Sequence, residues 1–131
     1  MREIKFRAWI TVDVNDIDED IKAMTYDLAF TKYAPINELL NKQDDLMQFT
    51  GLKDKNGKDI YEGDIVSFIT EKTCYDGLPL KTKRIGKVFW MEFRSVFAIQ
   101  INAFMNQDLY KFIQYGNTVE VIGNIYENPE M

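Results

Sequence analysis

The chain of 131 residues fits one compact domain and is too short for a large multidomain enzyme, and its 46% hydrophobic content excludes extensive disorder. It contains no histidine and one cysteine, which excludes Ser-His-Asp and Cys-His catalytic sites, an intrachain disulfide and a Cys/His zinc site. Sixteen basic and 21 acidic side chains leave a net charge of -5, which argues mildly against a dedicated binder of duplex DNA.

The N-terminal segment alternates apolar and polar residues from Glu3 to Val12, which predicts a half-buried strand. Phe6 and Ala8 are expected on its buried face, and Arg7 and Trp9 on its polar face. The segment has no apolar core of the kind that a secretion signal needs, and no run of about 18 apolar residues follows anywhere in the chain. We therefore expect neither secretion nor a membrane span.

The next stretch is less regular. Val14 to Asp20 is expected to form an acidic turn, and Ala23 to Phe30 a second strand or, as the weaker alternative, a helix. Pro35 and the INELLNK segment after it favour a short helix, since proline is tolerated in a first turn.

The middle of the chain predicts a strand, a turn and a second strand. LMQFTGL, residues 46 to 52, is rich in residues that favour strands, and EGDIVSFIT, residues 62 to 70, is a second such run. Between them, Asn56 and Gly57 mark a polar turn. The segment from Tyr61 to Val66 resembles the entry strand of SH3-like barrels, with Gly63 permitting a sharp bend.

The second half of the chain predicts a loop followed by a hairpin. Cys74 to Leu80 contains a glycine and a proline and should be a loop. KRIGKVFWME and SVFAIQI should form two strands around a corner at Phe93 and Arg94.

A short helix and a last strand complete the predicted elements. Asn106 is expected to cap the helix, which carries Leu109, Phe112 and Ile113 on one face and ends at Gly116. TVEVIGNIY then forms the final strand, in which Gly123 marks a bulge or a close backbone crossing. Together these elements predict one domain over residues 1–131 with an α+β, mainly β fold, either a curled antiparallel sheet or a small SH3-like barrel with one or two short helices.

Three blocks of the sequence resemble the YopX protein family of Gram-positive phages and prophages. They are REIKFRAW at residues 2 to 9, LMQFTGLKDKNGKDIYEGDIV at 46 to 66, and VEVIGNIYENPE at 119 to 130. The resemblance implies a single YopX-like domain in a phage-encoded or prophage-encoded cytoplasmic protein without an assigned activity. Residues 10 to 15 depart from the family pattern, because they prolong the first strand where the family has an aspartate and a lysine-rich turn.

An acidic cluster in the middle block raises the question of a metal site. Its members are Asp54, Asn56, Asp59, Glu62 and Asp64. Oxygen ligands at this density could hold calcium or magnesium, but Gly57 stands fourth from Asp54, where an EF-hand loop needs its glycine at the sixth position. A polar turn with solvated carboxylates is the favoured interpretation, and we expect no metal or other cofactor.

The basic stretch after residue 80 is a candidate nucleic-acid interface. It contains Lys81, Lys83, Arg84 and Lys87, and it leads to the aromatic Trp90. Strand alternation would place the lysines on one face and Arg84 with Trp90 on the other, which weakens this hypothesis. Edge lysines that discourage sheet-to-sheet pairing explain the same run.

Trp9 is the other candidate for an interaction, since a large aromatic on a polar strand face can anchor a partner protein. The alternative is that it packs against a second layer of its own chain.

The absence of a catalytic constellation and the surplus of aromatics predict a non-catalytic cytoplasmic protein. It is expected to self-associate or to bind a host or phage protein, with no membrane attachment. A nucleic-acid-binding module using the region from Lys81 to Arg94 is the alternative.

Overall fold

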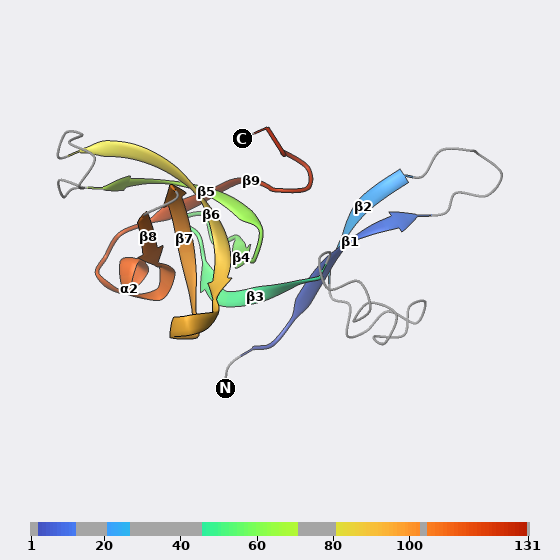
Figure 1. The fold of residues 1–131 in the computed structure, drawn as a ribbon, viewed down its shortest axis with the longest axis horizontal. Helices are drawn as coiled ribbons and strands as arrows, with labels where there is room; N and C mark the ends of the chain where they lie inside the picture. The colour runs from blue at the N-terminus through green and yellow to red at the C-terminus, as the bar shows by residue number, and fades with distance from the viewer. Residues whose placement is uncertain (1–2, 13–20, 27–45, 71–80, 103–104, 131) are drawn as a thin grey trace.

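Two antiparallel sheets dominate the computed structural model, which describes residues 3–12, 21–26, 46–70, 81–102 and 105–130. The larger sheet has five strands in the order β8-β7-β6-β5-β9. Its strands are β5 (Asp64–Thr70), β6 (Thr82–Met91), β7 (Val96–Asn102), β8 (Met105–Asp108) and β9 (Val119–Asn124). The sheet curls around one short helix, α2 (Leu109–Gln114), as Figure 1 shows.

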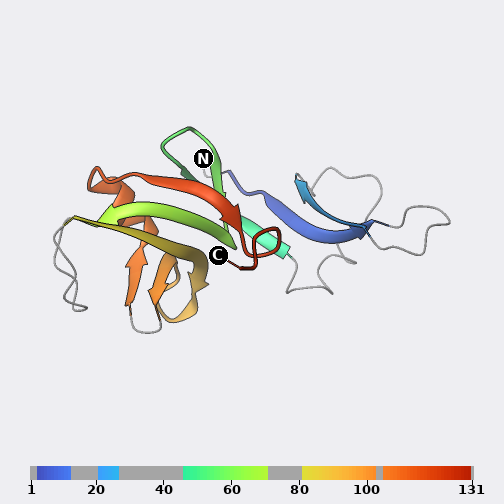
Figure 2. The same ribbon diagram turned by 90° about the horizontal axis from the view of Figure 1, so that it is seen from above.

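The smaller sheet has four strands in the order β2-β1-β3-β4. They are β1 (Phe6–Val12), β2 (Ile21–Tyr26), β3 (Leu46–Lys53) and β4 (Asp59–Tyr61). We call β1 and β2 the arm, because this pair extends away from the curled sheet (Figures 1 and 2). The five-stranded sheet, α2 and β4 form the body, and β3 runs between body and arm.

The core lies inside the curl of the body. Its buried side chains come from β4, every strand of the larger sheet except β8, and α2, namely Ile60, Val66, Phe68, Val88, Phe97, Ile99, Leu109, Phe112 and Val119. The rings of Phe68 and Phe112 meet edge to face, with 5.3 Å between their centroids. The helix is thus held by apolar contact, because six residues are too few for a helix to be stable alone.

The predicted mainly β fold is confirmed, and the curled sheet is the form that it takes. In the described residues β8 and β9 are the two edges of the larger sheet and do not pair with each other. The hairpin of β6 and β7 is also confirmed, and its corner is a 3-10 turn over Glu92–Arg94 that ends at Ser95 with a left-handed φ of 52°.

Three local features differ from the sequence prediction. β4 and β8 were not expected, since three and four residues are too few to show a strand pattern. The helix begins two residues later than predicted, and its cap is Asp108, whose side chain accepts a hydrogen bond from Lys111 N, where we expected Asn106. Asn106 lies in β8.

The bulge predicted at Gly123 is present in β9. Ile65 pairs with Gly123 and Val66 pairs with Val121, so Ile122 is the extra residue on the bulged strand. A Cβ atom at Gly123 would lie 2.4 Å from the Asn128 Oδ1 atom, so the chain also passes closely here. The close atoms belong to the Asn128 side chain, so the predicted bulge is confirmed, whereas the alternative of a close backbone crossing is not what the structure shows.

Some predictions concern residues outside the described part of the chain. They are the acidic turn at 14–20, the end of the second strand at 27–30, the helix after Pro35 and the loop at 74–80. Within the described residues, 23–26 form part of β2, which decides between strand and helix there. No described helix is long and apolar enough to cross a membrane.

Candidate functional site

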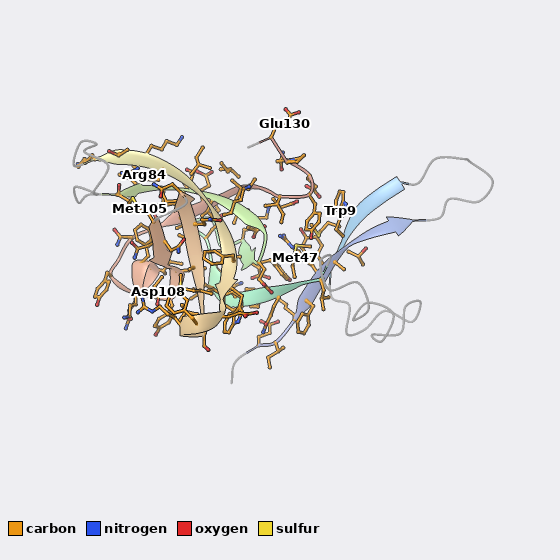
Figure 3. All side chains as sticks on the ribbon, viewed as in Figure 1. Trp9, Met47, Arg84, Met105, Asp108 and Glu130 are labelled. Carbon is orange, nitrogen blue, oxygen red and sulfur yellow. The ribbon has the colours of Figure 1, made fainter. Side chains whose placement is uncertain are left out.

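The residues predicted to make interactions lie at separate places on the molecule. We call the end of the arm that joins the body, around Arg7 and Trp9, the root of the arm. Figure 3 shows Trp9 near this root and Arg84 toward the far end of the body. Lys83, Arg84 and Lys87 lie on β6, and Lys81 directly precedes it. Trp90 lies near the other end of that strand, before the turn to β7. These residues therefore do not form one continuous site.

The lysines of β6 share the solvent face of the sheet. Lys83 and Lys87 are exposed, together with Ile85, which is 50% exposed between them. Arg84 points to the opposite side, is buried, and donates from Nε to the hydroxyl of Thr70 at 3.4 Å. The alternation predicted for this strand separates Arg84 from the lysines, so the surface that could meet phosphates carries lysines alone.

An open groove of about 490 Å³ runs beside this end of β6. Lys81 and Lys83 line it together with Lys55 and Glu120, which form an ion pair of 3.2 Å. Neither Lys81 nor Lys83 forms an ion pair with any residue that the structure describes. We call this the lysine groove; it offers an anionic ligand two cations that have no ion pair among the described residues.

A second hollow, of about 500 Å³, is mainly apolar and lies where β3, the corner between β6 and β7, and α2 come together. We call it the Trp90 hollow, and it is lined by Thr50, Gly51, Leu52, Trp90, Ser95, Val96, Phe97, Asp108, Tyr110 and Lys111. The Trp90 ring packs edge to face on the Phe97 ring at 4.9 Å and is still 40% exposed. Tyr110 is 59% exposed on the other side.

The turn between β6 and β7 carries an aromatic side chain that projects into solvent. Phe93, in the 3-10 turn between β6 and β7, is 85% exposed and is the most exposed large hydrophobic side chain in the described part of the chain. An exposed apolar ring thus lies in the turn between Trp90 and Ser95, which both line the hollow. Sequence reasoning treated Phe93 only as part of a turn.

The root of the arm is the most highly connected polar region that the structure describes. Arg7 of β1 is 2% exposed, and its Nη2 atom lies 2.8 Å from the Asp64 Oδ1 atom and donates to the Glu62 carbonyl. Its guanidinium also lies over the rings of Tyr61, at 4.8 Å, and Tyr26, at 5.9 Å. Arg7 thus lies buried on the face of β1 that the sequence predicts to be polar, because the start of β5 covers that face.

The three sequence blocks noted above meet at this root. Arg7 from the first block joins Asp64 from the second, and Trp9 stacks on Tyr126 from the third, with 5.7 Å between the rings. Gly63 O accepts from Ile125 N, which joins the second block to the third. Trp9 therefore contacts its own chain, which is the second of the two roles considered for it.

Each acid of the middle block has a different partner. Asp54 accepts hydrogen bonds from the backbone of Asn56, Lys58 and Val121, and Asp59 pairs with Lys5. Glu62 accepts from Gln48 N, while Asp64 pairs with Arg7. The side chains do not converge, and the described residues contain no group of three or more metal-binding side chains.

The environments of these acids shift their pKa values in opposite directions. Burial raises the pKa of Asp64 above its ordinary 3.8, although Arg7 acts against this, and burial likewise raises the pKa of Glu62 above 4.5. Burial also acts to raise the pKa of Asp54, but three backbone hydrogen bonds, the first from Val121, outweigh it and bring the pKa below 3.8. These shifts reflect structural contacts of single carboxylates.

A comparison with protein-family models agrees with the resemblance of the three blocks. The family model described as YopX protein matches residues 5–131. The crystal structure of protein EF1440 from Enterococcus faecalis is similar at 23% sequence identity and a TM-score of 0.47, over 99% of this chain and 98% of that chain. A search of curated proteins found no match.

Proposed function

Since the chain belongs to the YopX protein family, we propose that it is a phage or prophage accessory protein that catalyses no reaction and acts in the bacterial cytoplasm by binding protein surfaces. The first surface that it binds is a second copy of itself. The absence of histidine and the structural partners of the middle-block acids support a non-catalytic role. The Trp90 hollow and Phe93 support the contact between two copies.

The observation that carries this proposal is that the exposed Phe93 lies in the turn between Trp90 and Ser95, two residues that line the hollow. In a two-fold dimer, the same patch serves both partners, so a projecting side chain must fit a depression on that same patch. Phe93 of one copy would enter the Trp90 hollow of the other, and the reverse contact would form by symmetry. Tryptophan and tyrosine in an apolar depression are typical of the residues that dominate interface energies.

Light scattering coupled to size-exclusion chromatography tests the dimer. We expect the unchanged protein to be dimeric at micromolar concentration, and Phe93→Ala to be monomeric with unchanged circular dichroism, because Phe93 makes few contacts within its own chain. Tyr115→Ala is the matched control, since Tyr115 is 79% exposed and does not line the hollow. A monomeric unchanged protein, or a dimer that survives Phe93→Ala, would contradict the proposal.

A nucleic-acid-binding module is the second candidate, and the unpaired lysines favour it. Lys81, Lys83 and Lys87 could contact phosphates, and Ile85 between them could support a base. Salt titrations with labelled single-stranded and duplex oligonucleotides test this function. Binding should weaken steeply with salt and be lost when the three lysines are replaced by glutamate, but persist in Lys53→Glu. Absence of binding at low salt eliminates the candidate.

A further inference from the structure

A small pocket at the root of the arm has the composition of an anion site. Its volume is about 280 Å³, near the lower end of the range for small-molecule sites. Residues from the segment before β1, from the arm and from the body line it together, namely Lys5, Arg7, Tyr26, Lys58, Asp59 and Tyr61. We call it the arm pocket.

Most of the charged side chains that line the arm pocket are positive. Three of its lining residues are cations and one is a carboxylate. Lys5 is neutralised by Asp59, and this contact raises the pKa of Lys5 above its ordinary 10.5, so that it stays protonated. Arg7 is paired with Asp64 behind the pocket. Lys58 is exposed and forms no ion pair with any described residue.

Arg7 supplies an independent observation. Its Nε atom is the one buried side-chain polar atom, within the described residues, that has no hydrogen-bond partner. The Nη2 atom of the same side chain is fully engaged with Asp64 and the Glu62 carbonyl. Buried donors in proteins are nearly always satisfied, and an unsatisfied one calls for an explanation such as a missing ligand. Arg7 also lines the arm pocket, so an oxyanion bound there would lie beside the guanidinium that carries this donor.

We propose that the arm pocket binds a small molecule through its oxyanion group, a carboxylate or a phosphate, held between the Lys58 ammonium and the Arg7 guanidinium. The rings of Tyr26 and Tyr61, which already flank Arg7, form the walls. Arginine and lysine together match this chemistry, because the guanidinium directs its donors and the ammonium adds a mobile charge. The ligand contacts the arm through Tyr26 and the body through Lys58 and Tyr61, so its binding joins the two parts.

This site does not depend on the proposed dimer, because it shares no lining residue with the Trp90 hollow. The two inferences can therefore fail separately, and the Phe93→Ala variant should bind the anion as the unchanged protein does.

Thermal unfolding in sodium phosphate and in sodium acetate, with sodium chloride at equal ionic strength as reference, tests the pocket. We expect a saturable rise in the midpoint with at least one of the two oxyanions. Phosphate alone would identify a phosphate site, acetate alone a carboxylate site, and either outcome supports the proposal. The apparent affinity should fall about tenfold in Lys58→Ala, as expected for the loss of one charge-assisted hydrogen bond.

Lys87→Ala is the matched control, since Lys87 is an exposed lysine on β6 that does not line the pocket. Its affinity should equal that of the unchanged protein. Lys58 is exposed, so its replacement should not disturb folding. A midpoint that responds to phosphate and acetate only as it does to chloride, or an equal response in Lys58→Ala, would overturn the proposal.

Discussion

Arg7 on β1 and Asp64 on β5 form an ion pair of 2.8 Å in which both side chains are almost completely removed from solvent, at 2% and 1% exposure. Asp64 also accepts a hydrogen bond from Tyr61 N, so its carboxylate is held from both sides. Pairs of this kind often contribute little net stability, but removal of one partner leaves the other charge buried alone. The pair therefore fixes the position of the arm on the body.

Replacing Arg7 by methionine should lower the free energy of unfolding by about 3–5 kcal/mol, because Asp64 then remains buried without its cation. Guanidinium denaturation measures this. The double variant Arg7→Met/Asp64→Asn should lose less than the sum of the two single losses, since the buried charge is gone. Lys53→Met, at an exposed site, is the control, and a loss in Arg7→Met no larger than in this control would show that the pair is not a structural anchor.

Gly86→Ala should destabilise the body by about 1–3 kcal/mol through overpacking. A Cβ atom there would lie 2.4 Å from Ile99 Cγ2 and 2.8 Å from the Gln100 carbonyl oxygen, which is backbone and cannot move aside cheaply. Urea denaturation should show a lower midpoint. Lys87→Ala, next in the strand and exposed, should stay within about 0.5 kcal/mol of the unchanged protein. Equal stability of Gly86→Ala would mean that β6 and β7 are less closely packed than described.

Asp54→Asn should cost about 1–3 kcal/mol at neutral pH, because an amide replaces one of the two oxygens that accept backbone hydrogen bonds. The difference should depend on pH. The pKa of Asp54 is lowered in the folded protein, so its contribution is present above its ordinary 3.8 and is lost as pH falls through the folded value.

Denaturation curves of both proteins from pH 7 to pH 2 test this dependence, since Asp64 and Glu62 titrate equally in each and cancel in the difference. The stability difference between the unchanged protein and Asp54→Asn should shrink in acid. A difference that stays constant over this range would contradict the assigned role of the carboxylate.

The helix cap gives a direct comparison between the sequence prediction and the structure. Asp108→Ala should cost about 0.5–2 kcal/mol, because its side chain accepts the hydrogen bond from Lys111 N at 3.0 Å. Asn106→Ala should change the free energy of unfolding by no more than about 0.5 kcal/mol, since Asn106 is exposed in β8. Thermal denaturation of the two variants measures these losses of stability. A larger loss in Asn106→Ala than in Asp108→Ala would instead support Asn106 as the cap.

Most of the longer elements could be predicted from the sequence, because the pattern of apolar and polar residues that identifies each element lies within one continuous segment. The run from Leu46, the run from Asp64 and the hairpin around Phe93 have clear strand patterns, and the structure confirms all three. The two missed strands are the shortest ones, and β4 is strand only because β3 lies beside it. Pairing of that kind depends on the fold and leaves no local period.

The contacts at the root of the arm could not be predicted in the same way. Alternation within β1 assigns Arg7 to a polar face, but whether that face meets water depends on where Asp64 lies in space. One signal was available, since Arg7 and Asp64 both belong to the blocks that resemble the YopX family. The outward position of Lys83 and Lys87 could be predicted from the alternation of β6. The Trp90 hollow could not, because it forms only when three separate elements pack together.

The position of β3 has a consequence for any change in chain length. This strand pairs with β1 through Gln48, Met47 and Leu46 and with β4 through Phe49 and Lys53, so successive residues of β3 pair with its two neighbours in the smaller sheet. One residue inserted between Gln48 and Phe49 would reverse which side chains of β3 face inward on one side of the insertion. The arm would then present its opposite surface to the body, whereas an insertion of two residues would keep the faces and only lengthen the molecule.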